Sequence, residues 1–184
     1  MIRRIEKSLH ELSVMQAETR GRNILKDLLY HGTTSETTDF TTTKIKEVCD
    51  ATSITDGYKF GYEIKMRDYD RFESYDSVLM ESEKYFNLSF FKSLHNLNEI
   101  YYVVIYGVNA EQVYFFRLSD ITDKLENHEL RVKALNCNKT TLKGLDIQTE
   151  KVCLFLPKEM ASSRFSFNVN PFGNTGKYEW LRYN

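Results

Sequence analysis

Two acidic residues and a lysine lie on either side of a tight-turn signal in the sequence. Asp50 precedes the dipeptide Asp56-Gly57, and Glu63-Ile64-Lys65 follows it. Asp-Gly between two β-prone runs is typical of a two-residue hairpin turn, which would pair Asp50 directly with Glu63. Lys65 should emerge on the same face as Glu63, because side chains alternate along a strand. The spacing therefore predicts two carboxylates and an ammonium group on one face of a hairpin.

Two carboxylates in direct opposition repel each other, and a divalent cation between them would remove that repulsion. Mg²⁺ takes oxygen ligands, commonly one or two carboxylates together with water and substrate phosphate. A neighbouring lysine can orient an attacking water molecule and offset negative charge on a phosphate. The alternative is an exposed hairpin face that carries an ordinary Glu63–Lys65 ion pair. Spacing alone leaves both interpretations open.

The start of the chain offers a third carboxylate. Apolar residues recur at helical spacing within residues 3–30, which predicts a helix there. Glu18 falls in line with Leu25 and Leu29 and should face the interior, where a carboxylate needs a partner, a proton or a metal. Glu11 is a competing candidate, and a position of Glu18 at the edge of the apolar stripe, in contact with solvent, is the alternative.

The remaining patterns predict strands and helices in mixed order. Strands are expected at residues 44–55, 58–66, 100–106, 112–118, 151–156 and 165–169, helices at 77–94 and 119–130, and a turn cluster at 170–174. The Thr-rich run up to Thr43 predicts a loop, with an irregular first strand near its end as the alternative. This order indicates the α/β class, a mixed central β-sheet flanked by helices in a single domain of 184 residues.

Composition argues against several classes of protein. With 41% hydrophobic and 14% aromatic residues, the chain can form a core and is not of the disordered type. No apolar run approaches the length of a membrane span, and the first residues do not resemble a signal peptide. Three widely spaced cysteines without a C-x-x-C pair argue against a disulfide scaffold or a zinc site and favour a cytoplasmic protein.

The charge balance restricts any role with nucleic acid. Lys+Arg 25 and Asp+Glu 26 give a net charge of −1 and a pI near 6.4. A protein that holds nucleic acid by charge alone usually has an excess of basic residues. A nucleic-acid partner would therefore require a local basic surface, or metal ions that offset an acidic site.

The order of these features resembles the PD-(D/E)xK nuclease superfamily, which has the restriction-endonuclease-like fold and includes Holliday-junction resolvases. A helix with an inward Glu, a strand with Asp50, a turn, a strand with Glu63-Ile64-Lys65, then a helix and two strands give an α-β-β-β-α-β-β order. The resemblance covers about residues 10–120 and leaves 121–184 as a C-terminal extension of unknown role. It implies hydrolysis of DNA phosphodiester bonds with Mg²⁺, for which Mn²⁺ can substitute, by an endonuclease. Cys49 departs from the motif, because the family has Pro before the aspartate.

The resemblance also assigns roles to individual residues. Asp50 and Glu63 match the metal-binding carboxylates, and the backbone carbonyl of Ile64 would be a further ligand. Lys65 matches the catalytic lysine. Glu18 matches the first-helix glutamate that many members use in catalysis and metal binding.

Two basic residues after the motif are candidates for substrate binding. Lys84, on the helix that follows, resembles a helix lysine found in some members, and Arg67 lies just beyond the Glu63-Ile64-Lys65 motif. Both could approach a phosphate. The alternative for Lys84 is an ordinary exposed lysine on an amphipathic helix.

Three functions remain open at this point. The first is a DNA endonuclease, for which a homodimer is expected because restriction-type and junction nucleases often cut both strands as dimers. The second is a catalytically inactive domain of the same fold that serves as a binding or assembly module. The third is an RNA-directed nuclease. Basic and aromatic residues near the C-terminus, between Arg164 and Arg182, suit either a nucleic-acid surface or a hydrophobic edge of the fold.

Overall fold

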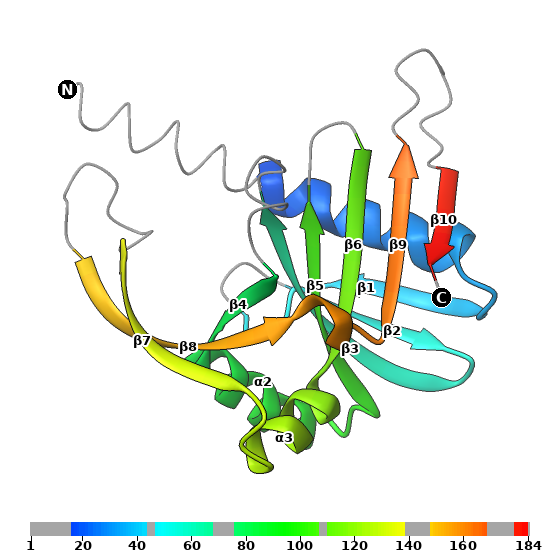
Figure 1. Ribbon diagram of the computed structural model, residues 1–184. Coiled ribbons are helices and arrows are strands. Elements are labelled where there is room, and N and C mark those ends of the chain that lie inside the picture. Colours follow the sequence, from blue (N-terminus) through cyan, green and yellow to red (C-terminus); the bar gives the residue numbers. More distant parts are fainter. Residues whose placement is uncertain are drawn as a thin grey trace, which may run out of the picture.

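The computed structural model describes residues 16–43, 47–67, 76–106, 110–138, 148–168 and 179–183, and a large mixed sheet lies at its centre (Figure 1). In spatial order its strands are β1 (Thr37–Thr42), β2 (Ala51–Thr55), β3 (Tyr58–Arg67), β5 (Glu99–Tyr106), β6 (Ala110–Arg117), β9 (Ser163–Asn168) and β10 (Glu179–Tyr183). Strands β3 and β5 are parallel, and the other neighbours are antiparallel. The α/β class with a mixed sheet is confirmed.

A second sheet and three helices complete the described chain. The second sheet has the order β4 (Ser77–Glu81), β8 (Gln148–Pro157) and β7 (Arg131–Asn138). The first helix consists of residues 16–27, continued by a π-helical turn, η1 (Leu28–Gly32). The other helices are α2 (Ser82–Leu94) and α3 (Leu118–Glu126), and a short 3₁₀ turn, η3 (Lys158–Met160), follows β8. Among these described elements, no helix is long and apolar enough to cross a membrane.

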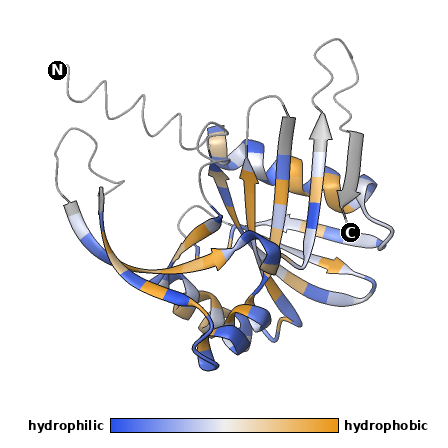
Figure 2. Cartoon of the chain, viewed as in Figure 1, coloured by the Kyte–Doolittle hydropathy of each residue, from blue (hydrophilic) through white to orange (hydrophobic). Residues whose placement is uncertain are grey.

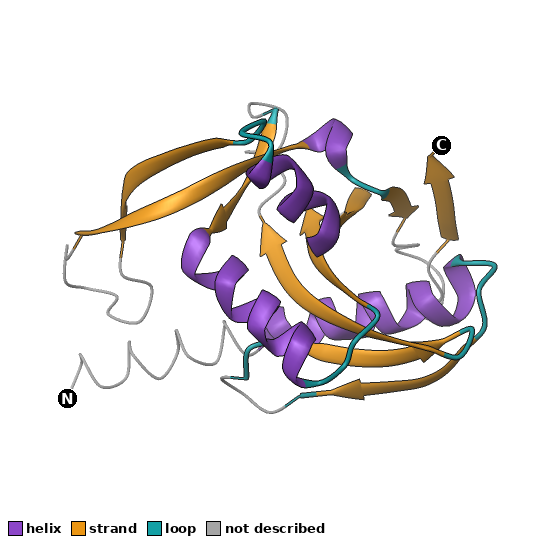
Figure 3. Cartoon of the chain, turned by 90° about the horizontal axis from the view of Figure 1, so that it is seen from below, coloured by secondary structure: helices purple, strands orange, loops and turns teal. Residues whose placement is uncertain are grey.

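The two faces of the main sheet carry separate cores. The first helix covers one face, where Ile24, Leu25 and Leu28 are fully buried against side chains from β3, β5 and β6. Figure 2 shows this helix alternating between hydrophobic and hydrophilic residues, as an amphipathic surface helix should. Helices α2 and α3 cover the opposite face together with the second sheet, and Figure 3 shows these elements from below. Consecutive residues of β5, such as Val103 and Val104, therefore face different cores.

The predicted hairpin turn is confirmed. Asp56 and Gly57 both have positive φ, 49° and 80°, which is the requirement of the type I′ turn that Asp-Gly favours. The register that follows from this turn pairs Thr55 with Tyr58 and Ala51 with Tyr62. The predicted strand at 100–106 is β5, whose residues are nearly all buried, as expected for a strand covered on both faces.

The helix predicted at 77–94 is wrong in its first part. Residues 77–81 form β4, and the helix begins only at Ser82. Val78 and Met80 are buried while Leu79 is 39% exposed, so these residues follow the two-residue period of a strand. Strand β4 pairs with β8 in the second sheet. Along the chain it lies between β3 and α2, so it adds an element to the expected α-β-β-β-α-β-β order.

The strand predicted at 44–55 is also shorter than expected. It begins at Ala51, residues 47–50 form a bend, and residues 44–46 lie outside the described part of the chain. The Thr-rich run predicted as a loop contains a strand, β1, which pairs along β2 with a register shift between Thr37 and Asp39. The alternative of an irregular first strand is therefore confirmed. Hydrogen bonding between backbones at the sheet edge, rather than burial of side chains, forms β1, because most of its residues are exposed.

Residues 121–184 contribute to both sheets. The predicted short helix is α3, and the predicted strands at 151–156 and 165–169 are β8 and β9. Strands β7 and β10 were not predicted; β7 is mostly exposed and lacks the apolar alternation that marks a half-buried strand. The predicted turn cluster at 170–174, like the start of the first helix, lies outside the described residues.

Candidate active site

The predicted site lies where the β2–β3 ladder stops. Its last pair is Ala51 with Tyr62. The Asp50 N–H still donates to the Tyr62 carbonyl at 2.8 Å, but the Tyr62 N–H donates to the Cys49 sulfur at 3.0 Å instead of to a backbone oxygen. The chain before Ala51 therefore leaves the ladder, and side chains take over the hydrogen-bonding edge of β3.

The Cys49 side chain closes the end of this ladder. Its thiol is fully buried and also lies within hydrogen-bonding distance of the Ala51 and Tyr62 carbonyls. Burial raises the pKa of Cys49 to about 12, so the thiol is neutral and acts as a donor. A proline at this position could not make these contacts, because it has no thiol.

The direct cross-strand pairing of Asp50 with Glu63 is wrong. Asp50 Oδ2 accepts a hydrogen bond from the Ile64 N–H at 2.7 Å, in the place that a backbone carbonyl would occupy if the ladder continued. A bond from a backbone N–H to a carboxylate is stronger than one to a neutral carbonyl. Asp50 is therefore anchored to the main chain of β3, and its carboxylate and that of Glu63 are held by different partners.

Glu63 is buried and held by two lysines. It is only 2% exposed, and it projects from β3 on the α2 side of the main sheet. Lys65 Nζ lies 2.7 Å from Glu63 Oε1, and Lys84 Nζ lies 3.1 Å from the same oxygen. The alternative interpretation correctly predicted the Glu63–Lys65 ion pair, but its exposed hairpin face is wrong, because Glu63 is buried.

Lys84 comes from the first turn of α2. Its ammonium group contacts Glu63 and lies 3.5 Å from the Val48 carbonyl oxygen. It is therefore part of the site, and the alternative of an ordinary exposed lysine is wrong. Whether it contacts a phosphate stays a prediction.

Arg22 also belongs to the site and was not predicted. Its Nη2 lies 3.2 Å from Asp50 Oδ1, so the first helix supplies a cation to the ladder end. Gly21 permits this approach, because a Cβ there would lie 2.9 Å from Ile64 Cγ2. The guanidinium Nε is buried without a hydrogen-bond partner in the described structure. A basic residue one helical turn after Glu18 was the sequence signal that could have indicated it.

Glu18 lies on the same helix face as Arg22, one turn earlier, and is half-buried. Within the described ranges, no three His, Cys, Asp or Glu side chains converge closely enough to hold a metal ion. Glu18, Asp50 and Glu63 therefore do not form a ready-made ligand group. The role of Glu18 as a metal ligand stays a prediction.

Burial and charge act together on the two central groups. Burial raises the pKa of Glu63, Asp50 raises it further, and the ammonium groups of Lys65 and Lys84 oppose the shift. Burial lowers the pKa of Lys65, but the charge and hydrogen bond of Glu63, together with Tyr102 and Asp50, outweigh this effect and the pKa of Lys65 is raised overall. Lys65 is therefore an ammonium group while it pairs with Glu63, so it can donate hydrogen bonds but cannot accept a proton.

The donor atoms at the ladder end fit a hard divalent cation. Asp50 and Glu63 supply carboxylates, as Mg²⁺ sites with few protein ligands commonly require. The Ile64 N–H points toward Asp50, and the carbonyl of a strand residue points to the same side as its N–H. That carbonyl therefore also faces the Asp50 side of β3, where the ladder has ended.

Arg67 lies farther along β3, on the face of Glu63 and Lys65. It is exposed and pairs in register with Tyr106. Burial raises the pKa of Tyr106 to about 12, and the positive charge of Arg67 opposes this shift. Arg67 is thus a neighbour of Tyr106 at the end of the strand, and its contact with substrate stays a prediction.

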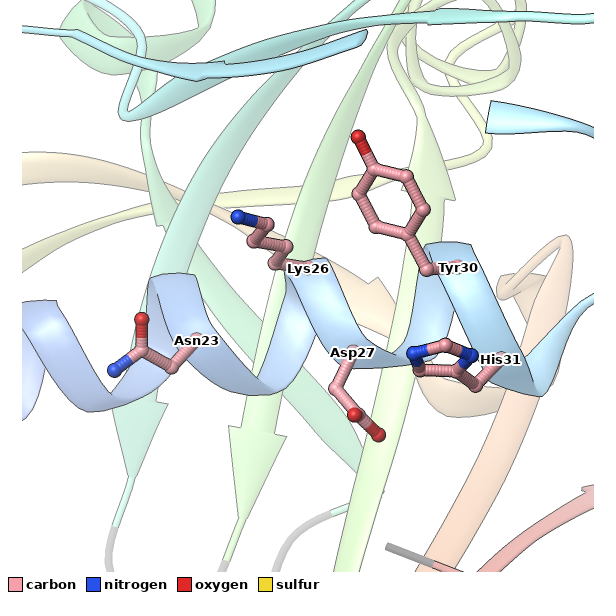
Figure 4. Close-up of a pocket in the computed structure, with 5 residues that line it drawn as sticks. All are labelled: Asn23, Lys26, Asp27, Tyr30 and His31. Carbon is pink, nitrogen blue, oxygen red and sulfur yellow. The ribbon is translucent and has the colours of Figure 1, made fainter. Parts of the chain in front are cut away.

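A hollow on the first helix lies away from this site. It has a volume of about 410 Å³ and is lined by Asn23, Lys26, Asp27, Tyr30 and His31. Figure 4 shows that all five side chains come from the first helix, including its π-helical turn. Lys26 Nζ lies 5.9 Å from the centroid of the Tyr30 ring. No group from another element converges there, so the hollow does not compete with the ladder end as a catalytic site.

No protein-family model matches the chain, and no curated protein matches it. The resemblance to PD-(D/E)xK nucleases therefore still depends on the residues themselves and on how the fold arranges them. The geometry of the ladder end, with its paired carboxylates and lysines, is the observation from which a function can be argued.

Proposed function

We propose that the chain is a metal-dependent endonuclease of PD-(D/E)xK type that hydrolyses DNA phosphodiester bonds. The observation that carries the proposal is the buried Glu63 carboxylate, held by one lysine from β3 and another from α2 beside an aspartate at a ladder end. A buried carboxylate is costly unless it is paired or bound to a metal.

The arrangement of the elements supports the same proposal. The first helix is followed by the antiparallel strands β1, β2 and β3, and α2 then leads to β5, which is parallel to β3. This is the order that the resemblance implies, with β4 added. The finer assignment to the restriction-endonuclease-like fold is part of the proposal.

Charge at the site suits a phosphate substrate. Three cations, Arg22, Lys65 and Lys84, surround the two carboxylates, so the cluster has a local excess of positive charge before any metal binds. A bound Mg²⁺ would supply a Lewis acid for the phosphate and a more acidic water molecule. Asp50, Glu63 and the Ile64 carbonyl would hold it.

The lysines would then act on the substrate. Lys65 and Lys84 would be less tightly paired with Glu63 when that carboxylate holds a metal, and they could then donate to phosphate oxygens. Both ammonium groups already lie within about 3 Å of one carboxylate oxygen, which is the placement that stabilises charge developing on a phosphate. Lys65 would also orient the attacking water molecule.

The second candidate is an inactive domain that keeps these pairs as internal ion pairs and serves in binding or assembly. It makes a different prediction about metal. An inactive module does not need Mn²⁺ to bind at Asp50, whereas the nuclease does.

The decisive experiment combines cleavage with metal binding. Purified protein is incubated with Mg²⁺ or Mn²⁺ and with duplex, single-stranded and branched DNA, and the same substrates made of RNA. Asp50→Asn should lower the cleavage rate by at least about 100-fold and abolish Mn²⁺ binding, with an unchanged circular dichroism spectrum. Asp39→Asn is the matched control, because Asp39 is an exposed aspartate of β1. Absence of cleavage by the unmodified protein on all substrates would overturn the proposal, as would full activity of Asp50→Asn.

A further inference from the structure

The second sheet ends in a two-stranded ribbon. Strand β4 pairs with β8 only over residues 153–157 of β8, whereas β7 pairs with β8 from residue 148 to residue 155. The two strands β7 and β8, called the arm below, therefore extend beyond the third strand. Figure 1 shows the arm projecting from the body of the molecule.

The two faces of the arm differ in charge. Because side chains alternate along a strand, the register of β7 and β8 places Arg131, Lys133 and Lys151 on one face, called the basic face below. The Arg131 guanidinium lies 4.6 Å from the centroid of the Phe155 ring on that face. The opposite, apolar face carries Val132 and Val152, which are 46% and 47% exposed, together with Ala134. Neighbouring residues of β7 thus present different chemistry to different sides.

The basic face is continuous with the candidate active site. Lys151 Nζ pairs with Glu81 Oε1 at 2.8 Å, and Glu81 is the last residue of β4, directly before α2. Three residues later, Lys84 reaches Glu63. Tyr102 pairs in register with Glu63, and its hydroxyl donates to the carbonyl of Leu79 in β4 at 3.2 Å. Tyr102 therefore links β4, at the root of the arm, to the strand that carries Glu63 and Lys65.

We infer that the basic face of the arm binds the phosphate backbone of duplex DNA beside the phosphate held at Glu63 and Lys65. This deepens the proposed function and rests on it. The chain is nearly neutral overall, so a nucleic-acid partner requires a local basic surface, and the basic face is one that adjoins the site.

The shape of the arm selects the kind of nucleic acid. The major groove of B-form DNA admits a two-stranded β-ribbon, whereas the major groove of an A-form RNA helix is too deep and narrow for side chains to enter. Arg131 and Lys133 lie about 6.6 Å apart along the strand, a spacing that suits neighbouring phosphates. Arg131 and Lys133 lie opposite Phe155 and Cys153, at the base of the two-stranded part of the arm, where β4 is also paired. With this part in the major groove of duplex DNA, the two cations would meet the phosphates at the edge of the groove, and duplex RNA offers no equivalent position.

Two adjacent residues of β7 provide a matched test. Lys133→Gln removes a charge from the basic face, and Ala134→Glu adds a negative charge to the apolar face, so each lowers the net charge by one. Both positions are exposed, and thermal unfolding checks that both variants fold. Binding to a labelled DNA duplex, and to the RNA duplex of the same sequence, is measured by fluorescence anisotropy in EDTA over a range of salt concentrations.

Loss of one phosphate contact should weaken duplex DNA binding by Lys133→Gln roughly eightfold at 0.1 M salt, and should reduce the slope of log affinity against log salt by about 0.9. Ala134→Glu should bind DNA within about twofold of the unmodified protein, because screening limits charge effects at a distance. The unmodified protein should bind the DNA duplex more tightly than the RNA duplex. Equal weakening by the two variants, unchanged binding by Lys133→Gln, or stronger binding of RNA would overturn the inference.

The test separates the arm from the proposed catalysis. If the unmodified protein cleaves DNA and Lys133→Gln binds it normally, the inference about the arm is wrong and the nuclease proposal stands. If the unmodified protein cleaves nothing but Lys133→Gln loses affinity for DNA, the arm binds DNA in a protein that is not a nuclease.

Discussion

Two polar clusters occupy the two ends of one hairpin and differ in how they are satisfied. Near the turn, the hydroxyl groups of Thr37, Ser53, Thr55 and Tyr62 form a hydroxyl cluster. Thr55 Oγ1 lies 3.0 Å from the Thr37 hydroxyl and 3.1 Å from that of Ser53, which in turn lies 2.9 Å from the Tyr62 hydroxyl. All four residues are buried and uncharged.

At the other end, the charged cluster consists of Asp50, Glu63, Lys65, Lys84 and Arg22. Its members pair across three elements, and its cations outnumber its carboxylates. The hydroxyl cluster is uncharged and bonds among its own members and to the Leu29 carbonyl, which accepts from Thr37 at 3.3 Å. The charged cluster keeps an excess of charge and an exposed lysine side chain, so it has the capacity to bind something more. The hydroxyl cluster therefore contributes to the fold, whereas the charged cluster has the charge to bind a further partner.

The largest expected effect comes from Lys65→Met in the charged cluster. The substitution keeps the length of the side chain and removes its charge, so it should lower the rate of DNA cleavage about 1000-fold while the protein remains folded. Single-turnover cleavage in Mg²⁺ measures it. Thr55→Val is the control and should keep its rate, and a Lys65→Met rate within tenfold of normal would contradict a catalytic role for this lysine.

The next effect concerns stability rather than activity. Thr55→Val preserves the shape of the side chain but removes the hydroxyl that bonds to Thr37 and Ser53. The substitution should therefore lower the free energy of unfolding by about 1–3 kcal/mol. Urea unfolding measures the loss. Thr38→Val, at an exposed neighbour on β1, should change it by less than about 0.5 kcal/mol. Equal effects at both positions would mean that the hydroxyl cluster does not stabilise the hairpin.

A smaller effect is expected where the first helix approaches β3. Gly21→Ala should favour the helix by up to about 1 kcal/mol, but the new Cβ would lie 2.9 Å from Ile64 Cγ2, and such overpacking costs about 1–3 kcal/mol. The protein should therefore lose stability on balance, as thermal unfolding would show. Asn23→Ala, on the exposed side of the same helix, should gain stability. A gain at both positions would show that the close approach is not tight.

The smallest effect is expected from Arg22→Ala. Arg22 pairs with Asp50 Oδ1 and so competes with a metal for that carboxylate. Its removal should tighten Mn²⁺ binding by up to about fivefold, the range of a partly exposed ion pair, as isothermal titration calorimetry would measure. Lys26→Ala on the next helical turn should leave the affinity unchanged. Weaker binding in Arg22→Ala would indicate that Arg22 orients Asp50 instead of competing for it.

Sequence could predict the hairpin because its turn determines its register. Asp56-Gly57 requires one turn type, and that type aligns Ala51 with Tyr62. The predicted pairing of Asp50 with Glu63 is wrong, because residues face each other across two strands only while the ladder continues. Asp50 lies beyond the end of the ladder, and its carboxylate accepts a hydrogen bond from the Ile64 N–H. No local sequence pattern predicts that a carboxylate will take the place of a backbone carbonyl.

Other differences arose from contacts between distant parts of the chain. Residues 77–81 have no strong local preference that separates strand from helix, and pairing with β8, more than 70 residues later, makes them a strand. Local patterns place Lys84 and Arg22 only on helices, because their partners come from β3 and from the bend before β2. The family resemblance singled out Lys84 but gave no indication of Arg22. The class of fold follows from local patterns, whereas the composition of the site follows from tertiary packing.

Several contacts of the site are made to backbone groups, so they do not depend on the side chains of the residues that supply those groups. The Asp50 carboxylate is held by the N–H of residue 64, the Asp50 N–H by the carbonyl of residue 62, and Lys84 lies against the carbonyl of residue 48. Every residue type except proline offers the first of these groups, and every type offers the other two. Substitutions at positions 48, 62 and 64 can therefore accumulate, within the limits of packing, without breaking these contacts. Distant relatives could keep this geometry after the surrounding residues have diverged.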